Sequence, residues 1–336
     1  MIEAALEKIK NKKNLTEKET EEVFAEIMTG SVETARIAAF LLALKEKKET
    51  VSEITGAARI MRKFAIKIKP RPARLVDTCG TGADAAGTFN ISTVSAFVAC
   101  GAGLSVAKHG NRAVSSKCGS ADVLRELGVN IDIGKETVEK CIDDIGIGFL
   151  FAPKLHLAMK HAMPARKMIK TRSIFNILGP LTNPAGARYQ LLGVYNEALT
   201  ITLAEVLKNL GSVAAMVVYG KCGLDEITTA DATAVAELKN NKIKIYAIYP
   251  EDFDVTRSQP EDLKGGAAAR NAKIALEVLG GKKGPRRDIV LMNAGAAIYV
   301  AGMAATLREG IKKAEESIDS GCALGKLNKM KEFTNR

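Results

Sequence analysis

The first seventy residues show the periodicity of short amphipathic helices. One set of apolar residues recurs at i, i+3, i+4 and i+7, the spacing of a single helix face: Ile37, Phe40, Leu41 and Leu44. Two capping-box patterns, Thr16-x-x-Glu19 and Thr50-x-x-Glu53, mark helix starts. Helices of this kind bury their apolar faces against each other, against the rest of the chain or against a second subunit.

Beyond Pro70-Arg71-Pro72 the pattern changes to short apolar runs that alternate with helical segments. The runs predict strands at 75–76, 104–107, 147–151, 190–195, 214–219, 243–248 and 288–292. Strands that alternate with helices indicate a mostly parallel central sheet with helices on both faces. The predicted fold class is therefore α/β, with a small all-helical domain and a larger α/β domain.

The domain boundaries follow from the same change of pattern. Residues 1–70 form the predicted helical domain, joined by part of 160–190, and residues 71–336 form the α/β domain. The uncharged stretch 289–307 approaches the length of a membrane span, but it contains Asn293 and two glycines. It reads as a buried strand, a turn and a small-residue helix, so we predict no membrane segment.

Composition agrees with a globular protein of two domains. The chain has 336 residues, 47% of them apolar and 26% charged. The net charge of +11 is scattered, and its densest runs, at 8–13 and 282–287, carry no interleaved aromatic residues. Solvated lysine-rich faces explain this charge best, with attraction of an anionic small molecule as the second reading. Six widely spaced cysteines form no C-x-x-C pair, which indicates reduced thiols in a cytoplasmic protein.

Two segments carry the residue types of phosphate-binding loops. They are D-T-C-G-T-G-A-D-A-A-G-T-F-N-I-S-T, at 77–93, and K-H-G-N-R-A-V-S-S, at 108–116. Each follows a predicted strand, and ligands of such sheets lie beyond the carboxyl ends of the strands. Two neighbouring loops of this type indicate one ligand with two separated phosphate groups.

Each part of these loops also has a plainer reading. The Gly80-Thr81-Gly82 segment offers backbone amides to an anion, or it is only a tight turn. Asn90, Ser92 and Thr93 open a helix, where they cap it or bind an anion. Beside a glycine loop, ligand contact is the better reading.

An acidic pair, Asp225-Glu226, follows the predicted strand at 214–219. Adjacent carboxylates repel each other, so such a pair is either solvated or bound to a cation. Carboxylates close to phosphates suit Mg²⁺, which takes one or two of them together with water and phosphate oxygens. The three histidines, His109, His156 and His161, form no catalytic triad and no zinc spacing, which disfavours hydrolysis by a protein nucleophile.

Taken together, the motifs resemble the anthranilate phosphoribosyltransferase family along essentially the whole chain. They are D-x-x-G-T-G-x-D-x-x-x-T-F-N-I-S-T, K-H-G-N-R-x-x-S-S-x-x-G-S-A-D, R-x-I-F-N-I-L-G-P-L-T-N-P and G-L-D-E, in that order. The resemblance implies transfer of the phosphoribosyl group of phosphoribosyl pyrophosphate (PRPP) to the amine of anthranilate, in tryptophan biosynthesis. It also implies Mg²⁺ as cofactor and a homodimer held through the helical domain.

The resemblance assigns site residues motif by motif. It implies PRPP contacts from Gly80, Gly82, Ala83, Asp84, Thr88, Asn90, Ile91, Ser92, Thr93, Lys108, His109, Gly110, Asn111, Arg112, Ala113, Val114, Ser115, Ser116 and Ser120. It implies a metal site of Ser92, Asp225 and Glu226, and anthranilate contacts from Gly80, Asn111 and Arg166. It further implies that His109 and His156 line the path of the acceptor.

One position departs from the family pattern, because Ala83 stands where the loop usually has glycine. A positive φ there would strain the loop, and a negative φ would make the methyl group harmless. Two other functions would leave different sequence features. A nucleoside phosphorylase should lack the I-F-N-I-L-G-P-L-T-N-P segment, and an inactive nucleic-acid-binding relative should have lost the acidic pair or the phosphate loops.

Overall fold

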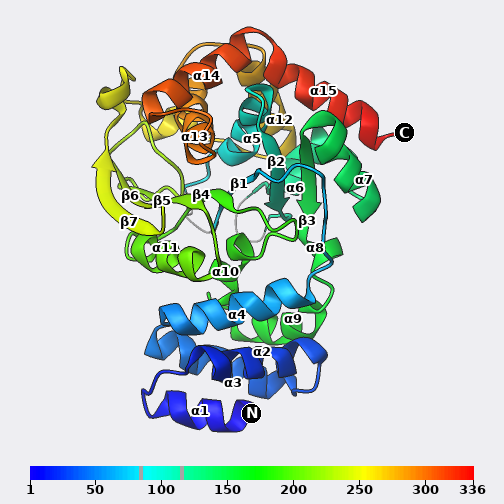
Figure 1. The fold of residues 1–336 in the computed structure, drawn as a ribbon, viewed down its shortest axis with the longest axis vertical. Coiled ribbons are helices and arrows are strands. Elements are labelled where there is room, and N and C mark those ends of the chain that lie inside the picture. Colours follow the sequence, from blue (N-terminus) through cyan, green and yellow to red (C-terminus); the bar gives the residue numbers. More distant parts are fainter. Residues whose placement is uncertain (83–85, 114–116) are drawn as a thin grey trace.

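The computed structural model describes residues 1–82, 86–113 and 117–336 (Figure 1). An N-terminal helical bundle lies against one side of an α/β unit, and both capping boxes predicted for it are present. The bundle contains α1 (Ile2–Lys10), α2 (Glu17–Thr29), α3 (Thr34–Lys47) and α4 (Val51–Phe64). The predicted apolar face of α3 is buried, which confirms the helical period of this segment.

The α/β unit is built on one seven-stranded sheet of order β3-β2-β1-β4-β5-β6-β7. Its strands are β1 (Leu75–Gly80), β2 (Ser105–Gly110), β3 (Ile147–Phe151), β4 (Tyr189–Gly193), β5 (Ala214–Gly220), β6 (Thr233–Lys239) and β7 (Lys242–Ile248). Strands β1 to β5 pair in parallel, and β6 and β7 add an antiparallel edge. The prediction of a mostly parallel sheet flanked by helices is confirmed.

The remaining helices cover the two faces of this sheet and link it to the bundle. They are α5 (Ile91–Gly101), α6 (Ser120–Glu126), α7 (Lys135–Lys140), α8 (Ala152–Leu155), α9 (Met159–Ile169), α10 (Phe175–Leu178), α11 (Leu199–Asn209), α12 (Ala268–Leu279), α13 (Pro285–Val300), α14 (Leu307–Asp319) and α15 (Cys322–Thr334). Short irregular helices span Cys141–Ile145, Gly179–Leu181, Pro250–Phe253 and Pro260–Leu263. Helix α9 packs on α2 and α3, so part of the segment 160–190 lies against the bundle.

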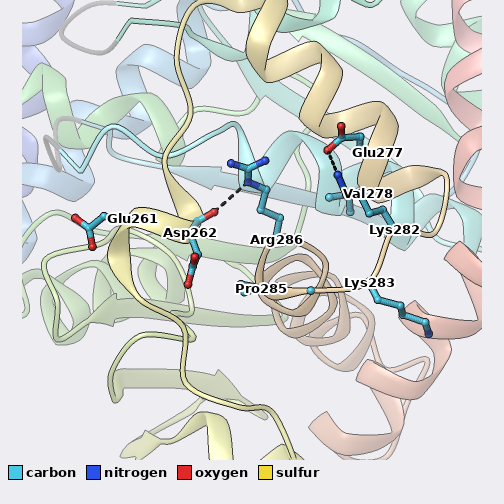
Figure 2. Close-up of a pocket in the computed structure, with 9 residues that line it drawn as sticks. Glu261, Asp262, Glu277, Val278, Lys282, Lys283, Pro285 and Arg286 are labelled. Atoms are coloured by element: carbon cyan, nitrogen blue, oxygen red, sulfur yellow. Dashed lines mark hydrogen bonds and ion pairs between the residues drawn. The ribbon is translucent and has the colours of Figure 1, made fainter.

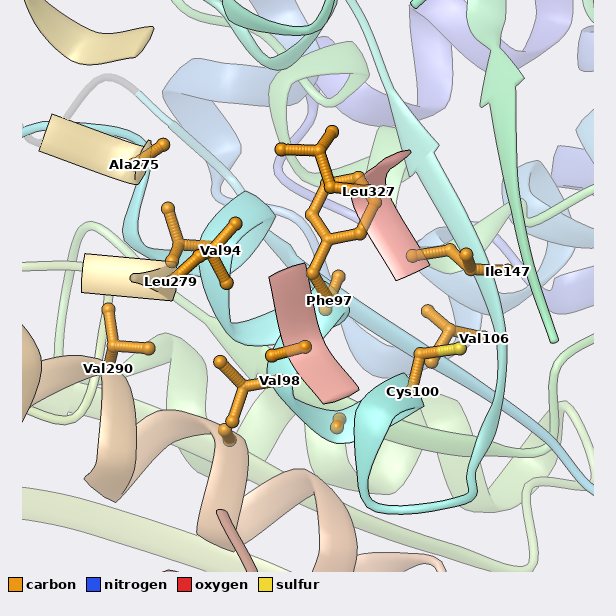
Figure 3. Packing of buried hydrophobic residues seen from close by; sticks show 14 of the residues in the cluster. Val94, Phe97, Val98, Cys100, Val106, Ile147, Ala275, Leu279, Val290 and Leu327 are labelled. Atoms are coloured by element: carbon orange, nitrogen blue, oxygen red, sulfur yellow. The ribbon is translucent and has the colours of Figure 1, made fainter. Parts of the chain in front are cut away.

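The two faces of the sheet have different apolar cores. On one face, α5 packs against α13 and α15 above β1 and β2, and Figure 3 shows Phe97 and Val98 of α5 among Val290, Leu327 and Ile147. On the other face, α11 and α4 pack together, and their apolar residues join those of β4 and β5 in one cluster. The bundle and this face of the sheet therefore share a core.

Two elements differ from the sequence-based prediction. Residues 288–292 form part of helix α13 rather than a strand, and the stretch predicted as strand, turn and helix is helical from Pro285 to Val300. A helix buried on nearly all sides has no polar stripe, so its pattern looks like that of a buried strand. Gly284 followed by Pro285 is the signal of a helix start that identifies it.

Strand β6 was not predicted because its sequence, T-A-V-A-E-L-K, is poor in strongly strand-forming residues. It is held in place by pairing with β5 on one side and β7 on the other. The turn into β7 is Asn240-Asn241, and both residues have positive φ, 51° and 60°. Asparagine tolerates this conformation, which is the one a two-residue hairpin of type I′ needs.

Glu53 organises the interior of the bundle. Its fully buried carboxylate accepts hydrogen bonds from the backbone N–H of Leu15 and of Thr50, at 2.8 Å each, and pairs with Lys47 at 2.9 Å. Glu19 makes the same kind of capping box on α2, but its side chain is partly exposed and pairs with Lys8. The two glutamates therefore share a motif and differ in burial.

We expect Glu53→Ala to lower the free energy of unfolding by roughly 3 kcal/mol or more, because Lys47 and two backbone amides lose their buried acceptor. Glu19→Ala, the matched control, should cost only about 1 kcal/mol as a lost helix cap. Urea unfolding followed by circular dichroism measures both losses. Equal losses in the two variants would contradict the role assigned to burial.

Candidate functional site

The two predicted phosphate loops lie at the carboxyl ends of neighbouring parallel strands. The first follows β1 and the second follows β2, while the acidic pair Asp225-Glu226 follows β5. The strand order reverses direction at β1, which has β2 on one side and β4 on the other. A reversal of this kind opens a crevice for ligands at the strand ends, and the three motifs meet there.

The carboxylate of Asp225 lies against the backbone at the end of β1. Its Oδ2 accepts a hydrogen bond from the backbone N–H of Gly82 at 2.7 Å. A Cβ atom on Gly80 would lie 2.4 Å from the same oxygen. Because glycine at position 80 has no side chain, the carboxylate of Asp225 can reach the backbone of the first loop.

The backbone of Asp225 is packed just as closely against β4. A Cβ atom on Gly193 would lie 1.5 Å from the Asp225 carbonyl oxygen, so no other residue fits at position 193. The Gly193 carbonyl in turn accepts a hydrogen bond from the N–H of Thr81 at 2.9 Å. The first loop, the acidic loop and the end of β4 are thus held together backbone to backbone.

Helix α5 begins beside the acidic pair. The N–H of Ser92 donates to Oε1 of Glu226 at 3.2 Å, and the Ser92 carbonyl accepts from the hydroxyl of Thr78 at 3.0 Å. The buried hydroxyl of Thr93 has no hydrogen-bond partner among the described residues. Ser92 and Glu226 therefore lie together at the start of this helix.

Lys108 extends from β2 underneath the first loop. Its Nζ lies 2.5 Å from the Thr78 carbonyl oxygen and 3.3 Å from the hydroxyl of Ser92, and only 3% of the residue is exposed. Burial lowers the pKa of this ammonium group, and the nearby carboxylate of Asp77 opposes the shift. Lys108 thus brings a buried positive charge to the base of the site.

Asp77, on β1, anchors the start of the second loop. One of its oxygens accepts from the N–H of His109 at 3.1 Å, and the other accepts from the amide of Asn183 at 2.8 Å. Burial raises the pKa of this carboxyl group, while Lys108 and the two donors lower it. The same Asn183 amide donates to the Ala107 carbonyl at 2.8 Å, so it fixes β1 and β2 together.

The second loop is closed by contacts with the start of α6. The hydroxyl of Ser120 donates to the Asn111 carbonyl at 3.2 Å. Asp122 accepts from the backbone N–H of Ala113 at 3.0 Å and of Gly119 at 2.8 Å. Exposed Arg112 lies over the ring of Phe151, 5.6 Å from its centroid. Asn111, Ala113 and Ser120 are therefore brought together.

His109 and His156 form a buried pair. Their Nε2 atoms lie 3.2 Å apart, and Nδ1 of His109 lies 3.2 Å from the Gly179 carbonyl oxygen. A carbonyl only accepts, so Nδ1 of His109 carries the proton and its Nε2 accepts from His156. Burial lowers the pKa of His109 to about 3 and that of His156 to about 4, so both rings are neutral at pH 7.

Arg166 comes from a separate element, helix α9. Its guanidinium group lies over the ring of Phe175, 5.4 Å from the centroid, and among the described residues it donates a hydrogen bond to the sulfur of Met163, at 3.8 Å, rather than to a carboxylate. Burial lowers its pKa from the usual value. Phe175 begins α10, which leads directly to Gly179 beside His109, so α10 connects the arginine with the histidine pair.

The donor set at the acidic pair fits a hard divalent cation. It consists of two carboxylates and the Ser92 hydroxyl, all oxygen atoms, at the edge of a phosphate-type loop. Within the described residues, no three His, Cys, Asp or Glu side chains cluster as a metal site. A site with few protein ligands suits Mg²⁺, because this ion keeps several water ligands and binds phosphate oxygens of the substrate.

Several predicted residues remain to be placed. Thr88 pairs with Lys264 in an isolated bridge, Ile91 is buried in the core, and Gly110 ends β2. Five further residues lie outside the described part of the chain: Ala83, Asp84, Val114, Ser115 and Ser116. The expectation about strain at position 83 concerns one of them.

A separate hollow of about 290 Å³ lies beside the start of α13 (Figure 2). Its lysines and arginine have partners, since Lys282 pairs with Glu277 at 3.0 Å and Arg286 donates to the Asp262 carbonyl at 3.0 Å. Lys283 lies 3.5 Å from Glu315. The basic run at 282–287 is therefore matched by acidic and carbonyl groups. Its last residue, Arg287, is buried and pairs with Asp319 at 2.6 Å, so at this position the prediction of a solvated face is wrong.

Among the described helices, none combines the length and the apolar character that crossing a membrane requires.

Family models match both parts of the chain. Residues 3–65 match the helical bundle domain of the glycosyl transferase family, and residues 72–324 match its a/b domain. The fold and the site thus define a glycosyltransferase of this two-part type.

The particular family follows from full-length relatives. The anthranilate phosphoribosyltransferase of Acetivibrio thermocellus is 52% identical over 335 residues, covering 100% of this chain and 97% of the relative. The crystal structure of the Thermus thermophilus enzyme matches with a TM-score of 0.94 at 40% identity, covering 99% of each chain. The Saccharomyces cerevisiae enzyme in complex with PRPP and Mg matches with a TM-score of 0.91 at 28% identity, covering 99% and 98%. This chain belongs to the anthranilate phosphoribosyltransferase family.

Some residues inside the quoted motifs support the site in a way that sequence reasoning did not assign to them. Asp122 and Asn183 are examples, since each holds backbone groups of the second loop or of its strand. Asp122 stands three positions after Gly119 at a helix start, which is a capping signal that could have identified it. The role of Asn183, which lies in the T-N-P end of its motif, has no local signal of this kind, because its partners are 76 and 106 residues away.

The histidine pair generates a prediction about pH. Both rings take up protons more readily in the unfolded chain, where a histidine pKa is about 6.5, than in the folded protein. Stability is therefore lost as pH falls below about 6.5, by up to about 1.4 kcal/mol per pH unit for each ring. We expect His156→Gln to become more stable relative to the parent protein as pH is lowered from 6.5 towards 4.5.

Urea unfolding at several pH values measures this change. His161→Gln removes a histidine outside the pair and is the matched control. A pH dependence of His156→Gln that runs parallel to that of the parent protein would contradict the neutral pair.

Proposed function

We propose that this protein transfers the phosphoribosyl group of PRPP to the amine of anthranilate and releases pyrophosphate, as a step of tryptophan biosynthesis. The observation that carries the proposal is the meeting of the glycine loop, Lys108 and the acidic pair at one point of the sheet edge. This combination suits a phosphorylated sugar with a charged leaving group. Membership of the family supports the same reaction.

The pyrophosphate end of PRPP would bind at the first loop and the start of α5. The backbone amides there and the positive end of an eleven-residue helix favour anionic groups. The ammonium group of Lys108 lies directly beneath. We assign the first-loop residues to this part of PRPP, and the second loop, from Lys108 to Ser120, to its other phosphate.

Ser92, Asp225 and Glu226 would hold Mg²⁺ beside the pyrophosphate. When bound, the cation would neutralise negative charge that develops on the leaving group. The relative from Saccharomyces cerevisiae, solved with PRPP and Mg, supports this cofactor.

Anthranilate would bind on the side of Arg166, Asn111 and Gly80, with the histidine pair along its path. The guanidinium group of Arg166 has no carboxylate partner among the described residues, so its planar fork is suited to the acceptor's carboxylate. The neutral rings of His109 and His156 would contribute an uncharged wall rather than a base. An aromatic amine is largely unprotonated at neutral pH and needs little help before it attacks.

The bond changes are a displacement at the anomeric carbon of the ribose. The amine nitrogen forms a bond to this carbon as the carbon–oxygen bond to pyrophosphate breaks, and the amine then loses a proton to water. The carbon is electron-poor during the exchange. The protein's contribution is to position both substrates and to stabilise the departing charge.

The direct test mixes the protein with PRPP, Mg²⁺ and anthranilate and follows anthranilate fluorescence. Loss of the signal that depends on all three components is the expected result. An unchanged signal at high protein concentration would overturn the proposed function.

Arg166→Ala should raise the KM for anthranilate by roughly tenfold to a hundredfold, because a charge-assisted pair with the carboxylate is lost. The KM for PRPP should change far less. Arg166→Lys keeps the charge without the fork and should fall between the two. Steady-state kinetics with each substrate varied in turn measures the split, and an equal rise in both KM values would contradict the assignment.

We also propose that the helical part, residues 1–70 with part of 160–190, forms a homodimer. Exposed apolar residues on α3 and on α9 support this, among them Leu42, Met163 and Met168. Leu42→Glu should shift the protein from dimer to monomer in sedimentation velocity. Ile201→Glu, on α11, is the matched control, because the two residues are 44% and 45% exposed. A dimer that survives Leu42→Glu unchanged would contradict this interface.

A further inference from the structure

Two buried asparagines in the C-terminal part of the chain contact the loops of the site. Asn271, on α12, is 2% exposed, and Asn293, on α13, is fully buried. Neither belongs to a motif that carries the family resemblance. Each forms a hydrogen bond with a residue far away in the sequence: Asn271 with Asn90, 181 residues away, and Asn293 with Ile227, 66 residues away.

Asn271 links the two phosphate loops through a chain of hydrogen bonds. Its Oδ1 accepts from the N–H of Gly266 at 2.8 Å, and its Nδ2 donates to Oδ1 of Asn90 at 3.0 Å. The amide of Asn90 then donates to the Cys118 carbonyl at 3.1 Å. Asn90 precedes α5 in the first loop, and Cys118 follows the second.

The direction of this chain is fixed by the backbone. The N–H of Gly266 only donates, so Oδ1 of Asn271 must face it and Nδ2 must face Asn90. Asn90 then presents its oxygen to Asn271, which leaves its own amide for the Cys118 carbonyl. An aspartate at position 271 would keep the first bond and would oppose the second, oxygen against oxygen.

The segment before Asn271 supports residues 87–89 of the first loop. The N–H of Gly265 donates to the Gly87 carbonyl at 2.9 Å, and the N–H of Phe89 donates to the Leu263 carbonyl at 3.2 Å. A Cβ atom on Gly265 would lie 2.7 Å from the Phe89 nitrogen and 2.6 Å from Oδ1 of Asn271. This packing holds residues 87–89 close to the segment that leads into α12.

Asn293 holds the acidic loop in a similar way. Its Oδ1 accepts from the N–H of Ile227 at 3.0 Å, and its Nδ2 donates to the Ile227 carbonyl at 2.8 Å. The same Nδ2 donates to the Ile289 carbonyl at 2.8 Å. Ile227 directly follows Glu226, so one side chain fixes the peptide groups on both sides of the residue that succeeds the metal-site pair.

We propose that Asn271 and Asn293 are positioning residues with separate tasks, which rests on the proposed function. Asn271 holds the two phosphate loops at the spacing that PRPP requires. Asn293 holds the Asp225-Glu226 carboxylates in the position that binds the metal. Neither residue touches substrate: Asn271 acts through the side chain of Asn90, and Asn293 acts through the backbone of Ile227.

The two tasks predict different responses to Mg²⁺. Loss of the Asn271 link should weaken PRPP binding at every metal concentration. Loss of Asn293 should weaken it only where the metal is limiting, because a saturating concentration fills a weakened metal site. A residue with a merely structural role would not produce this difference.

The experiment is isothermal titration of PRPP into the full chain at a limiting and at a saturating Mg²⁺ concentration. Asn271→Asp should bind PRPP about tenfold more weakly at both, as expected for one lost buried hydrogen bond in a rigid site. Asn293→Ala should bind about tenfold more weakly at limiting Mg²⁺ and should return to within about twofold of the parent protein at saturating Mg²⁺. Asn271→Ser and Asn293→Ser replace either variant if it does not fold.

Ser317→Ala is the matched control. Its hydroxyl donates a buried hydrogen bond of 2.8 Å to the Val98 carbonyl of α5, away from the loops. It should bind PRPP like the parent protein at both Mg²⁺ concentrations. Weakening of the control to the extent seen in the asparagine variants would overturn the proposal, since any loss of a buried hydrogen bond would then suffice.

Two further outcomes separate this inference from the proposed function. In the first outcome, the parent protein binds PRPP and consumes anthranilate, but the two asparagine variants either respond to Mg²⁺ in the same way or bind PRPP as well as the parent protein does. This outcome overturns the inference alone. A parent protein that binds no PRPP overturns the proposed function and the inference with it.

Discussion

The site depends on the close approach of Asp225 to bare backbone. Its carboxylate reaches the amide of Gly82, and its main chain lies against Gly193 at a distance that excludes any Cβ atom. The glycine loop, the end of β4 and the acidic pair are therefore positioned by one contact region. A side chain at position 193 would separate Asp225 from the glycine loop, so glycine is required here for the proposed metal site as well as for the proposed anion site.

Much of the fold could be predicted from the sequence because its signals are local. The capping boxes of α2 and α4 and the apolar face of α3 involve residues within one or two helical turns. Helix α13 and strand β6 were missed for opposite reasons. Helix α13 lacks a polar stripe because it is buried nearly all round, and β6 depends on its neighbours in the sheet rather than on its own propensity.

The same distinction applies to the site. The glycine loop, Lys108 and the acidic pair could be identified from residue type and from their place after strands, and the structure brings them together. The supporting roles of Asn183, Asn271 and Asn293 could not be identified in this way, although Asn183 stands within a quoted motif, because the residue type alone does not indicate which groups an asparagine holds. Their importance comes from partners far along the chain, which only the fold defines.

The core that the bundle shares with the sheet has a consequence for folding cooperativity. Residues of α4 and α11 belong to the same apolar cluster as Leu192 of β4 and Val217 of β5. Separating the bundle would expose the apolar side of α11 and the facing side of α4 to water, so both parts would lose buried apolar surface. The sequence divides into two regions near residue 70, but the free energy of unfolding does not divide there. The bundle and the sheet are one thermodynamic unit.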